Sequence, residues 1–234
     1  MKNNYEFSKS LAKWCFGADK PFIYASSAST YGDGSNGFSD DNKNINSYRP
    51  LNPYGFSKHI FDQWLIRHEF DKDCAGFKFF NVFGPNEYHK GTMASLVYKA
   101  YHQVSETGAL KLFRSANPQY NDGEFLRDFI YVKDCVDVLI WAFKNPEVKG
   151  IYNLGTGKAR SWNDLAKALF SAMGRKENIQ YVDMPEEIRD AYQYFTEAEM
   201  TKLRKAGYSE DFTELENAVV DYVKTYLMKP QQYL

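Results

Sequence analysis

The sequence has few cysteines and histidines, and their placement does not suit disulfide or metal chemistry. Its three cysteines, Cys15, Cys74 and Cys135, are far apart, odd in number and without a Cys-x-x-Cys pair. A disulfide framework or a zinc site is therefore not indicated. The four histidines are not spaced as metal ligands either. We expect three buried core thiols and no structural metal.

Net charge and long apolar runs are also lacking. The 234 residues carry a net charge of −1, which gives no general attraction to nucleic acid or to an anionic membrane surface. No apolar run reaches the roughly 18 residues of a membrane-spanning helix, and the first residues do not lead into a signal-peptide core. With 44% hydrophobic residues the chain can bury a sizeable core. We expect a globular cytoplasmic protein with no nucleic-acid or membrane partner.

A phosphate-binding glycine loop is missing too, although one segment imitates it. Residues 32–37 read Gly-Asp-Gly-Ser-Asn-Gly, which matches G-x-G-x-x-G after a predicted strand. Such a loop works only where its last glycine opens a helix whose N-terminus faces the pyrophosphate. Residues 38–50 are polar, rich in Asn and Asp, and have no helical period. The segment is predicted to be a surface loop.

What the sequence does contain is a tyrosine and a lysine one helical turn apart. Asn52 is a good N-cap, and Pro53 suits the first position of a helix. Apolar residues with helical spacing follow. Tyr54 and Lys58 should therefore lie on the same face of that helix. Because a nearby cation favours the tyrosinate form, the pair can serve as an acid/base group.

The spacing alone is weak evidence, because Tyr5 and Lys9 repeat it in what we interpret as an ordinary exposed helix pair. A serine distinguishes the Tyr54 copy. Residues 21–25 form an apolar run typical of a buried strand, and hydroxyl residues follow it directly. Ligands of open α/β sheets bind at the carboxyl ends of strands. We therefore expect Ser27 to hydrogen-bond the same substrate oxygen as Tyr54, the alternative being a Ser/Thr turn without chemistry.

Two further polar residues follow predicted elements. Asn81 lies near the end of a second buried strand, predicted within residues 75–85. Lys90 precedes a helix predicted from residue 92 to about 107. The helix dipole would favour loss of a proton from Lys90 there, which suits a proton-transferring lysine. A solvated loop lysine is the alternative.

Arg127 and Asp128 fit either a surface pair or a guanidinium fixed to bind a diphosphate. The rest of the chain alternates predicted strands and helices without a repeat or a linker. The strands are predicted at 111–113, 125–132 and 150–154, and the helices at 3–16, 133–144, 162–173, 196–206 and 212–228.

Taken together, these segments resemble the extended short-chain dehydrogenase/reductase superfamily, and within it the ADP-heptose 6-epimerases. The resemblance runs along essentially the whole chain, and the His-Lys-Gly-Thr-Met-Ala-Ser segment at 89–95 is its most discriminating part. The other matching segments are Ser27, Tyr54 with Lys58, 24–32, 79–85, 127–132, 153–157 and 192–196.

The resemblance implies an α/β fold: the C-terminal part of a Rossmann-like parallel sheet, interleaved with a small α/β substrate domain. Residues 1–82 and 128–158 would form the NADP-binding part, and residues 83–127 and 159–234 the substrate-binding part. The implied activity is NADP-dependent epimerisation at C-6 of a nucleotide-linked heptose, a step toward lipopolysaccharide core precursors. The family also suggests a homo-oligomer, specifically a pentamer.

The resemblance also implies a role for each matching residue. Tyr54 and Lys90 would be the two acid/base residues, Ser27 would polarise the substrate oxygen, and Lys58 would bind the nicotinamide ribose. The residues contacting NADP would be Asn3, Lys58, Val82 and Lys90. The residues lining the substrate would be Ser27, Asn81, Thr92, Lys99, Phe113, Arg114, Ser115, Ala116, Arg127 and Tyr192. The positions that depart from the family pattern are Lys78, Lys99 and 113–116.

One family feature has no counterpart here. Members begin with a strand, a Gly-x-x-Gly-x-x-Gly loop and a helix, and nothing like these precedes Asn3. The resemblance implies that about 90 residues, roughly three βα units, are lacking. Residues 21–25 would then be an unpaired apolar sheet edge, and we expect the chain alone to bind NADP weakly and to be inactive. Two alternatives stay open: another epimerase or dehydratase of the superfamily, and a non-catalytic remnant.

Overall fold

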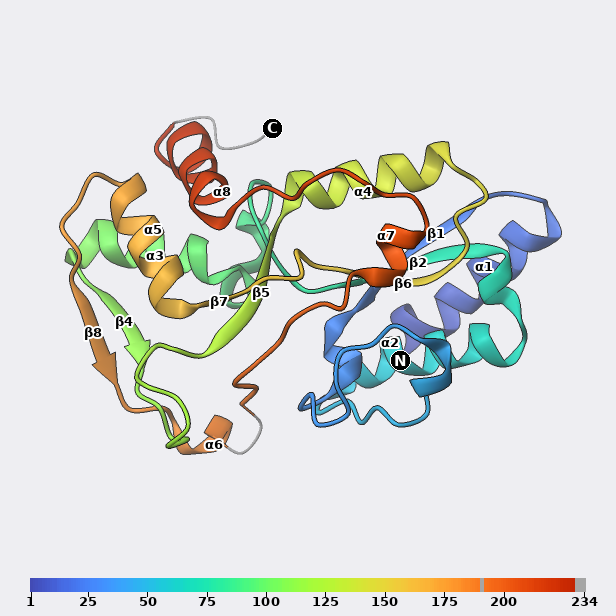
Figure 1. Cartoon of the computed structure of the whole chain (residues 1–234), viewed down its shortest axis with the longest axis horizontal. Coiled ribbons are helices and arrows are strands. Elements are labelled where there is room, and N and C mark those ends of the chain that lie inside the picture. Colours follow the sequence, from blue (N-terminus) through green and yellow to red (C-terminus); the bar gives the residue numbers. More distant parts are fainter. Residues whose placement is uncertain (190–191, 230–234) are drawn as a thin grey trace. The chain divides into compact units, whose positions relative to one another are not determined.

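The computed structural model describes residues 1–189 and 192–229, and these form two compact units, each assembled from three separate segments (Figure 1). Unit 1 comprises Met1–Phe80, Val136–Gly157 and Glu197–Glu210. Unit 2 comprises Asn81–Cys135, Lys158–Thr196 and Asp211–Leu234. Both units mix helices with parallel strands, so the predicted α/β class is confirmed.

Unit 1 is built on a parallel sheet in the order β1-β2-β6. The strands are β1 (Phe22–Ser27), β2 (Cys74–Phe79) and β6 (Gly150–Leu154). Ser27 pairs with Phe79, and Phe79 with Leu154, so all three strands end at one edge of the sheet. Ser27 is therefore delivered to the carboxyl edge, where ligands of such sheets bind. Among the described residues β1 pairs only with β2, which agrees with the predicted edge position of this strand.

Two helices cover this sheet on the same side (Figure 1). They are α1 (Ser8–Gly17), which continues a short π-helix (Lys2–Phe7), and α2 (Pro53–Arg67). Apolar residues of both helices pack against the first two strands. The buried members of this cluster are Ala12 and Cys15 from α1, Phe61, Trp64 and Leu65 from α2, Phe22 from β1 and Cys74 from β2. This packing fixes α2, and with it Tyr54 and Lys58, relative to β1.

Unit 2 contains two smaller sheets. In one, β5 (Leu126–Tyr131) pairs in parallel with β3 (Asn81–Phe83) and antiparallel with β7 (Ala159–Ser161). In the other, β4 (Leu110–Phe113) and β8 (Ile179–Val182) are parallel. The helices of this unit are α3 (Leu96–Thr107), α5 (Trp162–Ala172), α6 (Glu186–Arg189) and α8 (Leu215–Asp221), which continues into a π-helix (Tyr222–Leu227). α4 (Val132–Lys144) joins the two units, and α7 (Thr201–Lys205) belongs to unit 1.

The helix predicted from residue 92 begins later, at Leu96. Gly91 has φ 53° and ψ −123°, which interrupts the 3₁₀ stretch Tyr88–Met93, and Ser95 then caps α3 by accepting a hydrogen bond from the Tyr98 N–H at 3.2 Å. The helix predicted at 196–206 is likewise shorter and spans Thr201–Lys205. The strands β7 and β8 were not predicted.

The structural units and the predicted functional parts have different boundaries at four places, of which residues 81–82 and residue 158, both in unit 2, are the smaller ones. Residues 197–210 group with unit 1, because Lys202 donates to the Asp40 and Ile151 carbonyls at 3.0 and 2.7 Å. Residues 128–135 group with unit 2. Which unit binds NADP and which binds the substrate stays a prediction.

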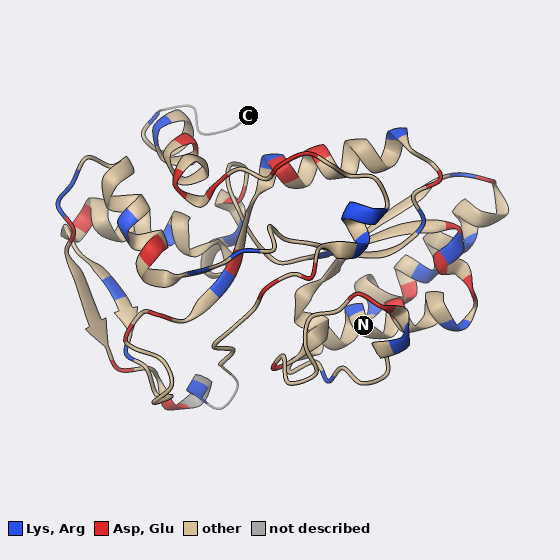
Figure 2. Cartoon of the chain, in the orientation of Figure 1, with Lys and Arg blue, Asp and Glu red and all other residues tan. Residues whose placement is uncertain are grey.

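The expectations drawn from the scarce residue types can be compared with the described part of the chain. All three cysteines are buried, as predicted. No cluster of three or more potential metal ligands occurs among the described residues. None of the described helices has the length and apolar character needed to cross a bilayer. Figure 2 shows acidic and basic residues interspersed along the ribbon.

Candidate active site

Tyr54 stands in the first turn of α2, where the sequence predicted it. The Asn52 side chain accepts a hydrogen bond from the Gly55 N–H at 2.8 Å, and Pro53 occupies the first turn. This cap satisfies one of the free N–H groups of the helix and fixes where α2 starts. Tyr54 is 52% exposed. Its phenol is therefore accessible to a ligand.

Gly55 brings the start of α2 against the turn that follows Ser27. A Cβ at this position would lie 2.6 Å from the carbonyl oxygen of Ser29. Only glycine permits so close an approach between the helix and the 3₁₀ turn Ala28–Tyr31. The contact places Tyr54 beside the segment that carries Ser27.

Ser27 is the half-buried N-cap of that 3₁₀ turn. Its hydroxyl accepts hydrogen bonds from the N–H and the hydroxyl of Ser29, at 3.2 and 2.8 Å. Its carbonyl accepts from the Thr30 hydroxyl at 2.8 Å. Ser27 therefore forms a structured Ser/Thr turn, and its own O–H remains a donor that can point toward a ligand.

Lys58 lies one turn after Tyr54 and leans toward the same ring. Its Nζ is 6.0 Å from the centre of the Tyr54 ring and donates to the Ala25 carbonyl at 2.7 Å. Burial lowers the pKa of the Lys58 ammonium from its ordinary value, and the carboxylate of Asp62 opposes that shift. Unit 1 thus brings Tyr54, Lys58 and the Ser27 turn together.

The second Tyr-x-x-x-Lys copy has different surroundings. Lys9 lies 4.5 Å from the centre of the Tyr5 ring and forms an ion pair with Glu6 at 3.7 Å. Tyr5 is half-buried against the core of unit 1, so the predicted exposed pair is wrong in that detail. The ring is partly buried because it packs beside the apolar face of α1.

A buried polar network lies beneath the Tyr54 site, and sequence reasoning missed it. Asp62 and Lys78 form an ion pair at 2.6 Å, with 0% and 2% of their side chains exposed. Asp62 also accepts from the hydroxyls of Tyr24 and Ser26 at 2.9 and 2.7 Å. Lys78 donates to the Thr30 hydroxyl at 2.8 Å. The network therefore joins α2 to β1, to β2 and to the turn that holds Ser27.

In unit 2, three of the predicted substrate residues meet in an aromatic cluster. The Arg127 guanidinium lies 5.3 Å from the centre of the Tyr192 ring, and the Phe113 and Tyr192 rings are 6.3 Å apart. Trp162 lies on Arg127 as well, at 5.8 Å. Burial lowers the pKa of Arg127 and raises the pKa of Tyr192.

The interpretation of Arg127 and Asp128 as a surface pair is wrong, because both side chains are buried, with 6% and 0% exposed. Arg127 donates to the carbonyls of Leu126 and Gln193. Within the described residues these are the hydrogen bonds of its guanidinium, which carries five donors, so further donors remain for a ligand.

The segment after Phe113 is more exposed. Arg114 forms an ion pair with Asp183 at 3.1 Å, and Ala116 is exposed. The Ser115 N–H donates to Asp122 at 2.8 Å, and its hydroxyl donates to the Asn117 carbonyl at 2.7 Å. These contacts hold the start of the 114–124 loop.

Lys90, Thr92 and Lys99 are exposed and lie close together in sequence and space. Lys90 and Thr92 belong to the 3₁₀ stretch Tyr88–Met93, and the Lys99 ammonium donates to the Thr92 carbonyl at 3.3 Å. Lys90 was predicted to stand near the N-terminus of a helix starting at residue 92, but α3 starts six residues after Lys90, at Leu96. Lys90 is a loop lysine in structural terms.

The remaining predicted ligand contacts lie in separate places. Asn81 and Val82 are the first two residues of β3, and the Asn81 side chain accepts from the Thr196 hydroxyl at 3.4 Å. Asn3 is exposed in the π-helix at the start of the chain. Asn3 belongs to unit 1, whereas Asn81, Val82 and Lys90 belong to unit 2, so their convergence on one ligand stays a prediction.

Comparison with known proteins identifies the family. The model of the NAD dependent epimerase/dehydratase family matches residues 1–155. The chain belongs to this family. It is 53% identical over all of its 234 residues to a protein of Nitratidesulfovibrio vulgaris (strain DP4) named ADP-L-glycero-D-manno-heptose-6-epimerase. It is 46% identical, over 100% of its length, to a protein of the same name from Fusobacterium nucleatum.

The crystal structure of ADP-L-glycero-D-manno-heptose-6-epimerase from Helicobacter pylori is also similar, with a TM-score of 0.78 and 29% identity over 95% of this chain. The chain spans 72% of the Nitratidesulfovibrio protein, 73% of the Fusobacterium protein and 65% of the Helicobacter chain.

The residue types explain why the buried network was missed. A tyrosine, a lysine and a serine can be found from their chemistry, whereas Asp62 and Lys78 look like ordinary charged residues. Two signals were available. Asp62 stands four residues after Lys58 on the same helical face, and Lys78 interrupts an apolar run that predicts a buried strand.

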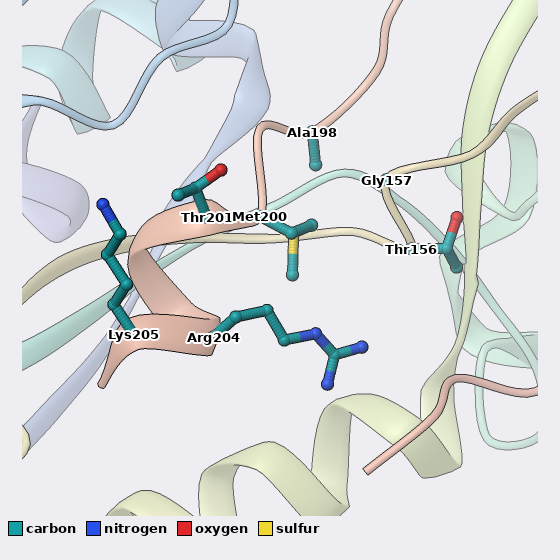
Figure 3. A pocket seen from close by; sticks show the side chains of 7 residues that line it. All are labelled: Thr156, Gly157, Ala198, Met200, Thr201, Arg204 and Lys205. Atoms are coloured by element: carbon teal, nitrogen blue, oxygen red, sulfur yellow. The ribbon is translucent and has the colours of Figure 1, made fainter. Parts of the chain in front are cut away.

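Unit 1 of this epimerase-family chain also has a surface pocket of about 580 Å³. Figure 3 shows the residues that line it: Thr156, Gly157, Ala198, Met200, Thr201, Arg204 and Lys205. None of the predicted site residues lines this pocket. The Arg204 guanidinium already donates to the Tyr208 and Glu210 carbonyls, at 3.0 and 2.6 Å, so it serves the local fold.

Proposed function

We propose that this chain carries the catalytic residues of an NADP-dependent epimerase that converts ADP-D-glycero-D-manno-heptose to ADP-L-glycero-D-manno-heptose. The observation that carries the proposal is the arrangement of Tyr54, Lys58 and the Ser27 turn at the carboxyl edge of a parallel sheet. The identity to proteins named for this activity supports the choice of substrate.

Inversion at C-6 needs transient oxidation of the alcohol, rotation of the resulting ketone, and reduction of its other face. A bound nicotinamide cofactor would supply the hydride chemistry. Tyr54 would take the proton from the C-6 hydroxyl on one face, while Lys58 stabilises the tyrosinate and the Ser27 hydroxyl donates to the same oxygen.

The residues of unit 1 fit such a cofactor. Within the described part of the chain the Lys58 ammonium makes one hydrogen bond, to Ala25 at 2.7 Å. An ammonium has three donors, so two remain for the ribose hydroxyls. The family description supports a nicotinamide dinucleotide in general, and NADP in particular is our proposal, with Asn3, Val82 and Lys90 as further contacts.

Lys90 would handle the proton on the second face of C-6. Inversion needs a proton-handling group on each side of the carbon, and Tyr54 can serve only one. Lys90 is exposed, so a ligand can reach its amine. A solvent-exposed lysine without catalytic function is the alternative, and the activity of a Lys90 variant distinguishes the two.

The substrate would be held mainly by unit 2. The buried Arg127 guanidinium forms no ion pair among the described residues, and its donors fit a diphosphate. Tyr192 and Phe113 offer ring faces and edges beside it. The other proposed substrate contacts are Asn81, Thr92, Lys99, Arg114, Ser115 and Ala116.

The epimerase assay that tests the proposal follows conversion of ADP-D-glycero-D-manno-heptose in the presence of NADP. It is run on the chain itself and on a fusion with the part of the Nitratidesulfovibrio relative that the chain does not span. Conversion by either protein supports the proposal. Turnover of UDP-hexoses in place of the ADP-heptose would instead favour a hexose 4-epimerase of the same family.

A titration of the chain with NADP by calorimetry separates the enzyme from a non-catalytic remnant. We expect the chain alone to bind NADP with a dissociation constant above roughly 10 μM, or about −7 kcal/mol, and the fusion to bind more tightly. Weak binding by both proteins would favour the remnant. Sedimentation velocity on the same samples tests the proposed homo-oligomer, for which a pentamer is expected.

A further inference from the structure

Glu87 is a buried carboxylate in unit 2 that has no role in the proposed chemistry. Only 4% of it is exposed. Its two oxygens accept four hydrogen bonds: from the Ser95 N–H, from the Ser95 hydroxyl at 2.7 Å, from the Tyr222 hydroxyl at 3.0 Å and from the Gly84 N–H at 3.4 Å. All of these donors are neutral. A carboxylate has acceptor sites for about four hydrogen bonds, so its capacity is used fully.

These contacts close the segment that carries Lys90. We call residues 88–94 the Lys90 loop. Glu87 precedes this loop and Ser95 follows it, so the Glu87 side chain joins the two ends. The Glu87 carbonyl also accepts from the Lys90 N–H at 3.0 Å. The loop is therefore held at both ends and at Lys90 itself by one residue.

The same carboxylate ties the Lys90 loop to the core of unit 2. Tyr222 is fully buried in that core, beside Phe83 at the end of β3. Ser95 caps α3. Glu87 thus links the end of β3, the start of α3 and the last helix at one point. A charged acceptor makes stronger hydrogen bonds than a neutral one, which suits a residue that must hold an exposed loop.

We propose that Glu87 is a positioning residue that holds the Lys90 amine toward the second face of the substrate carbon. The inference rests on the proposed function, in which Lys90 serves that face. Glu87 has no part in proton transfer, because its oxygens are buried and engaged. Its effect on the reaction passes through the Lys90 loop.

Hydrogen exchange on the chain itself tests the structural part. Glu87→Gln replaces one acceptor oxygen by a donor, so one of the two backbone N–H groups that Glu87 accepts from, Ser95 or Gly84, loses its partner. Exchange of the amides of residues 88–95 should then rise by about tenfold or more. Asp134→Asn is the matched control, since Asp134 is also a buried carboxylate of unit 2 and accepts from the N–H and hydroxyl of Thr213, both at 2.8 Å. Unchanged exchange in Glu87→Gln would overturn the proposal.

The epimerase assay tests the functional part, run beside dismutation of an aldehyde analogue, which uses the Tyr54 face only. Lys90→Ala should lower epimerisation while dismutation stays within about twofold, because general acid/base groups contribute about 10²–10⁴-fold. Glu87→Ala should also lower epimerisation but not dismutation, by a smaller factor than Lys90→Ala. Ser95→Ala is the milder change and should lower epimerisation by a smaller factor still. Asp134→Asn should show no selectivity.

The two possible failures are distinguishable. If Lys90→Ala lowers both activities equally, the proposed role of Lys90 is wrong, and the inference about Glu87 fails with it. If Lys90→Ala is selective but Glu87→Ala and Ser95→Ala lower both activities equally or neither, Glu87 is only structural and the inference alone is overturned.

Discussion

Tyr54 is the residue on which the proposed chemistry depends, and its surroundings allow a clean test. Tyr54 is half-exposed and belongs to neither the buried cluster around Phe61 nor the one around Tyr31, so Tyr54→Phe should leave the fold intact. Removing the phenol in the fusion with the Nitratidesulfovibrio segment should lower its epimerisation kcat by about 10²–10⁴-fold. Tyr5→Phe in the other Tyr-x-x-x-Lys copy is the matched control and should retain full activity. If Tyr54→Phe kept more than about half of the kcat, Tyr54 would not be the acid/base residue.

His59, next to Lys58, predicts how stability depends on pH. It is buried, and its Nδ1 has no hydrogen-bond partner among the described residues. Burial, together with the charge of Lys78, lowers the pKa of His59 to about 4, against the opposing effect of Asp62. Between pH 6.5 and about pH 4, His59 binds a proton in the unfolded chain but not in the folded chain. Stability is therefore complete above pH 6.5 and falls as the pH drops toward 4.

The free energy of unfolding should fall by on the order of 3 kcal/mol between pH 6.5 and pH 4. Urea denaturation at pH 7 and pH 4.5 measures it. His59→Gln should remove most of this dependence, whereas His68→Gln, at an exposed position, should leave it unchanged. An equal pH dependence in the His59 variant and the parent chain would show that other groups carry the acid sensitivity.

At the scale of single elements, the ion pair of Asp62 and Lys78 fixes α2 to the sheet. Lys78→Met leaves the buried Asp62 carboxylate without its cation and should cost about 3–5 kcal/mol of unfolding free energy. Lys72→Ala breaks the exposed pair with Glu69 and should cost less than about 1 kcal/mol. A double-mutant cycle of Lys78→Met and Asp62→Asn should show that the losses of unfolding free energy from these two substitutions are not additive. Additive losses would mean that the two charges act independently.

The same elements show what the sequence can predict. The start of α2 was predicted correctly because Asn52 and Pro53 act locally, through a cap and a fixed φ. The start of α3 was predicted wrongly, because the positive φ of Gly91 cannot be inferred from the neighbouring residues in the sequence. From the sequence, the proximity of Ser27 and Tyr54 could be predicted only from the rule that ligands of α/β sheets bind at the carboxyl ends of strands. The contact of Gly55 with Ser29, which sets their proximity, needs coordinates.

At the scale of the whole molecule, each unit gathers residues that are far apart in the chain. The core of unit 2 contains Phe83 and Val104 from its first segment, Leu169 from its second and Val219 from its third. The α/β class and a discontinuous division were both implied by the family resemblance. Periodicity alone could not give the division, because it reports which face is buried and not which partner buries it.

Helix α8, in the third segment of unit 2, should therefore be essential for the stability of this unit. Val219 is fully buried in that core, while its neighbour Val220 on the same helix is 37% exposed. Val219→Ala removes two buried methyl-sized groups and should lower the unfolding free energy by about 2 kcal/mol. Val220→Ala makes the same chemical change at the surface and should cost less than about 0.5 kcal/mol. Hydrogen exchange then locates the loss, and amides of β4, α3 and α5 should lose protection in Val219→Ala because they share its core. Equal effects of the two substitutions would mean that α8 contributes little to that core.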